Sequence, residues 1–173
     1  MPRKSPNPQD HIERLLVLRR SATPEVPLDG MAILGRAKRL TALTRPAIEA
    51  VFARYELESG EFDVLATLRR AGTPYELRPT ELMRDLLVSS GGLTDRLARL
   101  ERKGFIERRK APEDARSMLA RLTSKGRRWI DRAYAEDMAV EEAMLAPLTQ
   151  NERRQLARLL AKLLVSLEHA SDV

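Results

Sequence analysis

Hydroxyl and cationic side chains gather in one short stretch of the sequence, on a predicted helix over residues 90–103. Hydroxyls lie at its start (Ser89, Ser90 and Thr94) and cations follow (Arg96, Arg99 and Lys103). Hydroxyls and free backbone N–H groups at a helix N-terminus can bind phosphate oxygens. A guanidinium can donate two hydrogen bonds to a guanine edge. These residue types in this order indicate recognition of nucleic acid.

A second group of cations follows on a predicted β-hairpin, with strands over 105–110 and 117–122 and a connection over 111–116. Its candidate DNA contacts are Arg108, Arg109, Lys110, Asp114 and Arg116. Three consecutive basic residues on one strand cannot all face a core. An arginine near the tip can enter a narrow minor groove, where the potential is more negative. Asp114 lies two positions from Arg116 and can hold that guanidinium in one pose.

The elements around these residues predict a winged helix-turn-helix. A short helix over 80–87, with Thr80 as N-cap and a further DNA-contact candidate, is followed by a tight turn and the 90–103 helix. Leucines at i, i+4 and i+7 dock that second helix: Leu93, Leu97 and Leu100. Asp95, Arg99 and Arg102 fall on its opposite side. Gly104 is well placed to end it in a left-handed conformation.

The remaining segments predict a mainly α fold with a small β-hairpin wing, a DNA-binding lobe and a helical dimerisation lobe. We expect an arm with a short helix over 1–28, a dimerisation helix region over 29–57, the winged lobe over 58–123 and C-terminal helices over 124–173. Pro46 should end or kink the second region near Thr44. Ser59 is the expected N-cap of the first helix of the lobe.

The last helix carries a wide stripe of leucines: Leu156, Leu159, Leu160, Leu163, Leu164 and Leu167. A domain this small would struggle to bury this stripe together with the long first helix. An exposed apolar stripe usually marks an interface, which predicts a homodimer. The alternative is that the stripe packs within one subunit.

Composition narrows the class of protein. The net charge of +6 suits a nucleic-acid partner, although a basic surface without a partner is the alternative. The chain has no cysteine and two distant histidines, His11 and His169, so we expect no metal, no cofactor and no catalytic triad, and therefore no enzyme. No run of about 18 apolar residues is present, and the start is charged and proline-rich, so we expect a cytoplasmic location.

Several segments resemble the MarR family of transcriptional regulators. SGEFDVLATLRRAG (59–72) is similar to the first helix of its DNA-binding lobe, and 79–82 and 88–104 to its positioning and recognition helices. Residues 114–117 and 122–126 resemble its wing tip and the start of its next helix. The resemblance covers about residues 30–168.

The resemblance implies an obligate homodimer, with recognition helices in successive major grooves of double-stranded DNA and wings in minor grooves. By position it implies recognition-helix contacts from Ser89, Ser90, Thr94, Arg96 and Arg99. Asp114 and Arg116 match the family's wing tip. The intervening position is often basic in the family but is Ala115 here, so one phosphate contact is missing.

The resemblance also implies control by a small aromatic or phenolic ligand, bound between the two lobes. Candidate lining residues are Arg36, Arg39, Tyr55 and Trp129, although the two aromatics can equally be ordinary core or interface residues. The first functional hypothesis is a repressor that binds a pseudo-palindromic DNA site as a homodimer and is released from DNA by such a ligand. The second is a constitutive or architectural DNA binder without an effector. A winged module for protein contacts, or an enzyme, lacks the acidic pockets or His and Asp clusters that would favour it.

Overall fold

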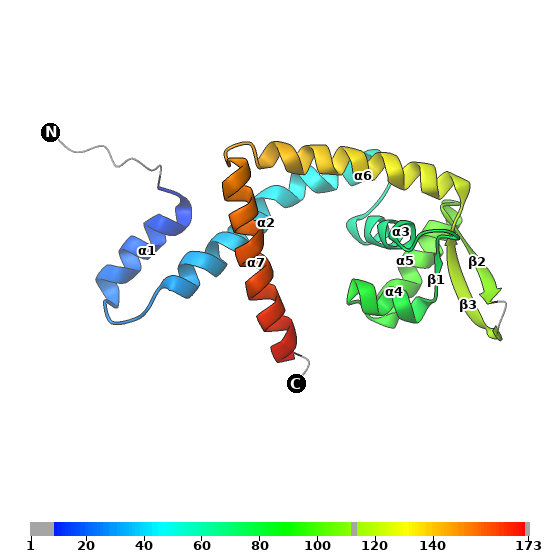
Figure 1. The fold of residues 1–173 in the computed structure, drawn as a ribbon, viewed down its shortest axis with the longest axis horizontal. Helices are drawn as coiled ribbons and strands as arrows, with labels where there is room; N and C mark the ends of the chain where they lie inside the picture. The colour runs from blue at the N-terminus through cyan, green and yellow to red at the C-terminus, as the bar shows by residue number, and fades with distance from the viewer. Residues whose placement is uncertain (1–8, 112–113, 172–173) are drawn as a thin grey trace. The chain divides into compact units, whose positions relative to one another are not determined.

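The computed structural model describes residues 9–111 and 114–171, without the side chains of 114–116 and 171. The chain divides into two compact units, Met1–Pro46 and Ala47–Val173. Helices and one small sheet make up the described residues (Figure 1). Among the described residues, we find no helix with the length and apolar character that a membrane span requires.

The first unit holds helix α1 (His11–Ala22) and the first part of helix α2 (Asp29–Arg54). Asp10 caps α1, because its Oδ1 accepts a hydrogen bond of 2.8 Å from the backbone N–H of Glu13. Ile12 and Leu16 are buried, and a Cβ added at Gly35 would lie 3.5 Å from the Cγ2 of Ile12. The apolar side of α1 therefore packs on α2.

Helix α2 is continuous through Pro46, so the predicted end of the helix near Thr44 is wrong, while the alternative of a kink there stays a prediction. Proline removes one intrahelical N–H donor, and helices on either side of it can remain joined. The division between the two compact units still falls at this residue.

The second unit contains the winged helix-turn-helix: α3 (Ser59–Arg70), β1 (Glu76–Leu77), α4 (Pro79–Leu86), α5 (Ser90–Arg102), β2 (Ile106–Ala111) and β3 (Asp114–Leu122). The N-cap residues of α3 and α4 are Glu58 and Arg78, one or two positions before the predicted caps at Ser59 and Thr80. In both, the backbone N–H of the cap donates to a glutamate three residues on, at 3.0 Å to Glu61 and 2.7 Å to Glu81.

The strands form one antiparallel sheet in the order β1–β3–β2. The predicted hairpin is confirmed, with strands that extend further toward the tip, where Ala111 pairs with Asp114. The two-residue strand β1 pairs Glu76 with Arg121 and was not predicted. The wing is therefore a three-stranded sheet rather than a hairpin alone.

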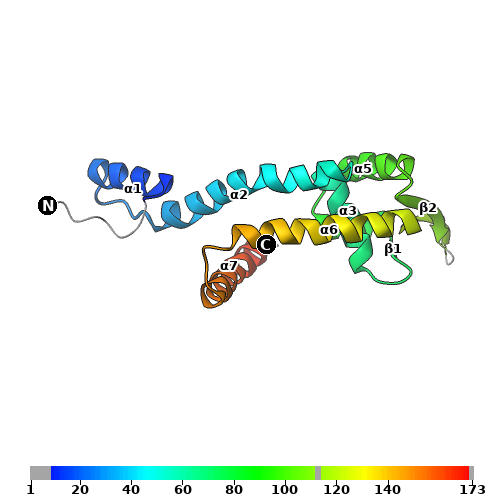
Figure 2. The same cartoon turned by 90° about the horizontal axis from the view of Figure 1, so that it is seen from above.

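Two long helices follow, α6 (Ser124–Met144) and α7 (Gln150–Ser171). Helix α6 lies alongside α3 (Figures 1 and 2). Thr123 caps α6 by accepting from the N–H of Gly126 at 3.0 Å, and Thr149 and Glu152 form a capping box at the start of α7. Helix α7 buries none of its described side chains within the subunit.

The core of the second unit joins α2, α3, α4, α5, the sheet and α6. Its largest fully buried side chains include Phe105, Leu65, Leu68, Leu82, Leu93, Leu100 and Ile130. Phe52 stacks on Phe62 with ring centroids 4.1 Å apart. Side chains of α5 and of the hairpin therefore share one buried core.

Candidate nucleic-acid interface

Helix α5 sits where the sequence places a recognition helix. Ser89 caps it, with Oγ accepting from the N–H of Gly92 at 3.4 Å, and Leu93, Leu97 and Leu100 are buried as predicted. Gly104 follows with φ of 72°, the left-handed conformation expected after the helix. The leucines leave the opposite side of α5 free to contact another molecule.

The N-terminal half of α5 is exposed and polar. Ser89, Ser90, Thr94 and Asp95 are all exposed, and nothing lies within 4 Å of a Cβ added at Gly91. The Thr94 hydroxyl donates to the carbonyl oxygen of Ser90 at 2.8 Å, and its oxygen can still accept a hydrogen bond from another molecule. A backbone without side chains at 91 and 92 lets a phosphate approach the helix N-terminus closely.

Two cations of α5 that the sequence assigned to DNA are bound inside the subunit. Arg99 Nε donates to Glu61 Oε1 at 3.0 Å, and Lys103 Nζ donates to Glu61 Oε2 at 2.7 Å. Lys103 also donates to the carbonyl oxygen of Glu56 at 2.7 Å, and Arg99 to Glu58 at 3.0 Å. The structure therefore places Arg99 and Lys103 against α3, away from the outward face on which the sequence prediction put Arg99.

Glu61 is the buried centre of this network and was missed from the sequence. Its side chain has no exposed surface. Burial acts to raise the pKa of Glu61, but hydrogen bonds from Lys103, the Glu58 backbone and Arg99 outweigh it, and the pKa is lowered. The hydrogen bond to Glu61 correspondingly raises the pKa of Arg99. The carboxylate is thus ionised and paired. The sequence signal that could have identified Glu61 is its position three residues after the N-cap residue Glu58, which is the spacing of a capping box.

Arg96 also turns toward α3. A Cβ at Gly60 would lie 2.5 Å from the Cζ of Arg96, so the guanidinium covers this glycine. Arg102, by contrast, is exposed on α5, as is Thr80 on α4. The outward cation of α5 is thus Arg102, which the sequence put on the correct side without naming it as a DNA contact.

The hairpin presents its cations on exposed positions. Arg108, Arg109 and Lys110 are all exposed. Arg108 Nε lies 3.2 Å from Glu101 Oε2, and Arg109 Nη1 lies 3.7 Å from Glu76 Oε2. The side chains of Asp114 and Arg116 lie outside the described residues, although their backbone belongs to β3. The predicted hold of Asp114 on Arg116 stays a prediction.

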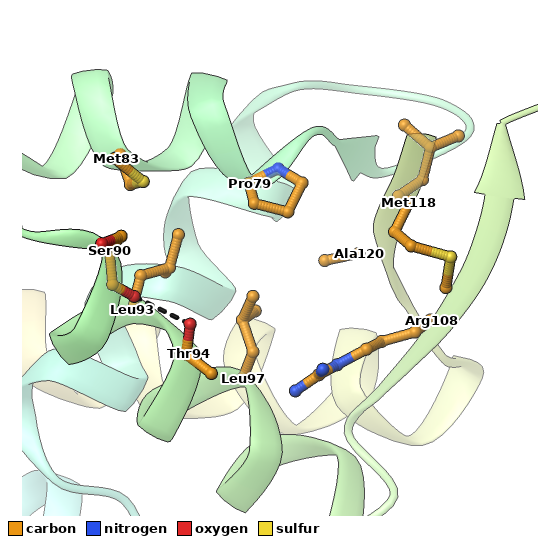
Figure 3. A pocket seen from close by; sticks show the side chains of 10 residues that line it. Pro79, Met83, Ser90, Leu93, Thr94, Leu97, Arg108, Met118 and Ala120 are labelled. Atoms are coloured by element: carbon orange, nitrogen blue, oxygen red, sulfur yellow. Dashed lines mark hydrogen bonds between the residues drawn. The ribbon is translucent and has the colours of Figure 1, made fainter. Parts of the chain in front are cut away.

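A cavity of about 210 Å³ opens between α4, α5 and the sheet (Figure 3). Apolar groups dominate its lining, with Arg108 reaching from β2 toward the recognition helix and Thr94 at its edge. The lining residues are Pro79, Met83, Ser90, Leu93, Thr94, Leu97, Arg108, Met118, Leu119 and Ala120. The sequence did not reveal this cavity, because its walls come from three separate elements.

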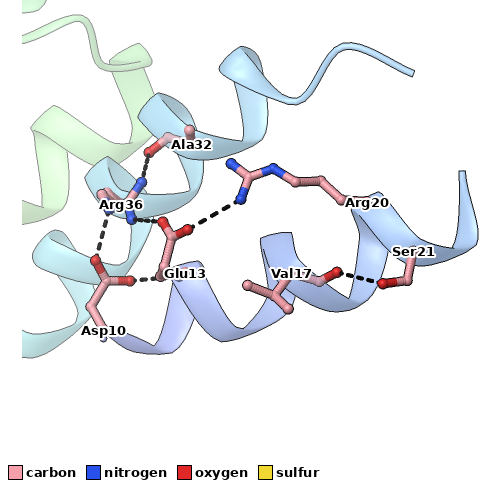
Figure 4. Close-up of polar contacts among 7 residues, drawn as sticks. All are labelled: Asp10, Glu13, Val17, Arg20, Ser21, Ala32 and Arg36. Carbon is pink, nitrogen blue, oxygen red and sulfur yellow. Dashed lines mark hydrogen bonds and ion pairs between the residues drawn. The ribbon is translucent and has the colours of Figure 1, made fainter. Parts of the chain in front are cut away.

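Three of the four ligand candidates have partners within their own unit. Arg36 donates to Asp10 at 2.8 Å and Glu13 at 2.9 Å within the first unit (Figure 4), and Arg39 is exposed. Trp129 donates from Nε1 to the Tyr55 carbonyl oxygen at 2.7 Å, and their rings meet edge to face. Tyr55 and Trp129 are partly buried against the core of the second unit, and a ligand-binding role for the four residues stays a prediction.

The fold and this surface define a winged helix-turn-helix DNA-binding protein. Residues 57–118 match the model of the MarR family. The transcriptional regulator PecS of Dickeya dadantii is 35% identical over 143 residues, which span 83% of this chain and 86% of PecS. The chain belongs to the MarR family of transcriptional regulators.

Solved structures agree with this assignment. A mutant MarR from E. coli in complex with operator DNA is 28% identical, has a TM-score of 0.63, and covers 80% of this chain and 99% of that chain. The organohalide sensing RdhR-CbdbA1625 regulator, in its 2,4-dichlorophenol bound form, has the same fold with a TM-score of 0.69, 20% identity and 81% coverage of each chain. These structures agree with the fold, and the MarR relative with 28% identity is one that binds operator DNA.

Proposed function

We propose that this protein is a cytoplasmic, sequence-specific repressor that binds a pseudo-palindromic DNA site as a homodimer and is released by a small aromatic ligand. The observation that carries DNA recognition is the exposed N-terminal half of α5, where hydroxyls flank two glycines beside a cationic hairpin. The complex of MarR with operator DNA supports a matching role for this surface.

Within this proposal the contacts divide by chemistry. Ser89, Ser90 and Thr94 take phosphates and base edges at the start of α5, and Arg102 takes phosphate further along. Thr80 at the start of α4 is a further phosphate contact. On the wing, Lys110 and Arg116 approach the minor groove, with Arg108 and Arg109 beside them. Arg96 lies against Gly60 and reaches DNA only by moving away from α3.

The apolar surface of α7 supports the homodimer. Its leucines are 37–55% exposed in the single subunit, from Leu163 at the lower end to Leu164 at the upper. A stripe of this size in water is unfavourable and is covered when two copies associate. A two-fold dimer would place two recognition helices on half-sites about one helical turn apart.

The cavity beside α5 supports ligand control. It lies between the helix and the sheet that must both reach DNA, and it offers apolar walls with one guanidinium from Arg108. A small aromatic molecule with a phenolate or carboxylate would fill such a space. The 2,4-dichlorophenol bound form of RdhR-CbdbA1625 supports this ligand class.

Selection of bound duplexes from random-sequence DNA tests the central proposal. We expect one enriched pseudo-palindrome with half-sites about 10 base pairs apart, bound by a dimer in sedimentation experiments. Leu163→Asp should yield monomers that lose the pseudo-palindrome, while the exposed Arg154→Asp, on the same helix, remains dimeric. Enrichment of no sequence would refute specific recognition.

Release by 2,4-dichlorophenol separates the repressor from the constitutive alternative. The compound should weaken binding of the selected duplex by the native protein. Ala120→Val, which fills part of the cavity, should keep DNA binding and lose the response. An equal response of both proteins would place the ligand elsewhere, and no response to an aromatic-acid panel would favour the constitutive binder.

A further inference from the structure

The carboxylate of Glu61 is fully buried at the start of α3 and uses both oxygens to hold α5. Oε1 accepts from Arg99, and Oε2 accepts from Lys103 and from the Glu58 backbone N–H, at 3.0, 2.7 and 3.0 Å. Two of these three donors are cations at the C-terminal end of the recognition helix, Arg99 in its last turn and Lys103 at its C-cap. Because they are four residues apart, the two cations lie on the same face of α5, and Glu61 binds this face over about one turn.

The network extends on both sides of Glu61. Lys103 also donates to the Glu56 carbonyl oxygen, and Lys125 of α6 donates to the Lys103 carbonyl oxygen at 2.7 Å. The C-terminal end of α5 is therefore tied to α3 and α6 by side chains, while its N-terminal half is exposed. A rotation of α5 about its axis would break the bonds to Glu61.

We propose that Glu61 is a positioning residue for DNA recognition, which fixes the rotation of α5 and withholds Arg99 and Lys103 from phosphates. The inference rests on the proposed DNA-binding function. A cation held by a buried carboxylate contributes little to phosphate attraction, so Glu61 lowers affinity for nonspecific DNA while orienting Thr94 and its neighbours for the specific site. Both effects raise the ratio of specific to nonspecific affinity.

Replacement of Glu61 by Gln tests both effects in the full-length protein. The probes are the duplex enriched from random DNA and a scrambled duplex of equal length. For each phosphate that a released cation neutralises, the slope of log K against log salt steepens by about 0.9, so we expect an increase of about 0.9 to 1.8 on the scrambled duplex. The specificity ratio should fall about tenfold, as when one base contact is misplaced.

Glu58→Gln is the matched control, because it removes the same charge three residues away. Its carboxylate is largely exposed and binds Arg99, which stays bound to Glu61. We expect little change in slope or specificity ratio. Lys103→Met added to Glu61→Gln should reverse about 0.9 of the steeper slope, since it removes one released cation.

An unchanged slope and ratio in folded Glu61→Gln, verified by circular dichroism, would overturn the inference. Loss of a buried partner of two cations can unfold the domain. In that case the single variant Lys103→Met is the test. An unchanged salt slope would support a lysine that is withheld from DNA by Glu61. A slope reduced by about 0.9 would show that Lys103 contacts a phosphate directly and would overturn the inference. Absence of any enriched duplex for the native protein would instead refute the proposed function.

Discussion

Gly126 lies so close to Phe105 that a Cβ at position 126 would come within 2.0 Å of the Phe105 carbonyl oxygen. The same carbonyl accepts hydrogen bonds from the N–H of Thr123 at 3.0 Å and from its hydroxyl at 3.2 Å. The start of α6 is thereby clamped onto the residue that links α5 to the wing. Only glycine permits this backbone approach.

Gly126→Ala should therefore destabilise the protein by about 1–3 kcal/mol, because backbone atoms must move to admit the methyl group. Thermal unfolding measures the effect. Gly30→Ala is the control, since nothing lies within 4 Å of its added Cβ in helix α2, and it should be neutral or slightly stabilising. Equal melting temperatures for the two variants would contradict the close approach.

Asp137 on the inner side of α6 is buried, and among the described residues none donates a hydrogen bond to its Oδ1. Burial raises the pKa of Asp137, and the charges of Glu141 and Asp63 raise it further. The protonated form stabilises the fold below the ordinary pKa of 3.8, and this stabilisation is lost as pH rises through the folded-state pKa. Ionised Asp137 therefore costs stability at neutral pH.

Asp137→Asn should raise the free energy of unfolding by about 1 kcal/mol at pH 7.5, with a gain that shrinks toward pH 4. Chemical denaturation across this range gives the comparison. The control Asp131→Asn removes an exposed carboxylate that pairs with Arg69, and it should bring no gain at pH 7.5. A gain for Asp137→Asn that is the same at every pH would argue against titration of this group.

Arg36 of α2 joins this helix to α1 by donating to Asp10 and Glu13, and it also donates to the Ala32 carbonyl oxygen within α2 (Figure 4). Arg36→Gln should speed amide hydrogen exchange across residues 11–22 and leave α3 and α5 unchanged. Arg39→Gln, at an exposed position on the same helix, should leave α1 protected. If both variants exchange alike, the contacts of Arg36 do not hold α1.

Arg116→Ala tests the wing. We expect about tenfold weaker binding to the selected duplex and a salt slope reduced by about 0.9, without loss of the dimer. Arg14→Ala removes the same charge from an exposed position on α1 and should bind as the native protein does. Native-like affinity of Arg116→Ala in a mobility-shift titration would exclude a wing contact from this arginine.

The sequence predicted those parts of the fold that depend on local signals. Leucines at i, i+4 and i+7 and Gly104 after the helix predicted α5, and both features are confirmed. Strand β1 escaped prediction because two residues carry no periodicity, and it exists through pairing with β3 more than 40 residues later.

The orientation of the α5 cations could not be predicted from helical spacing. Spacing correctly put Asp95 and Arg102 opposite the leucines. Arg99 was placed with them, yet it turns to Glu61, which lies 38 residues earlier and approaches α5 only in the folded protein. The partner of a long cationic side chain depends on tertiary contacts. The number of basic residues in a helix sequence can therefore exceed the number of cations that are available to bind DNA.

The ratio of affinities for the selected and the scrambled duplex tests sequence-specific recognition most directly. Both are measured by fluorescence anisotropy in one buffer at physiological salt, because the electrostatic contribution depends on salt. We expect the native protein to bind the selected duplex about 10³-fold or more tightly than the scrambled one. A ratio near one would show that the surface of α5 does not distinguish DNA sequences and would contradict sequence-specific recognition.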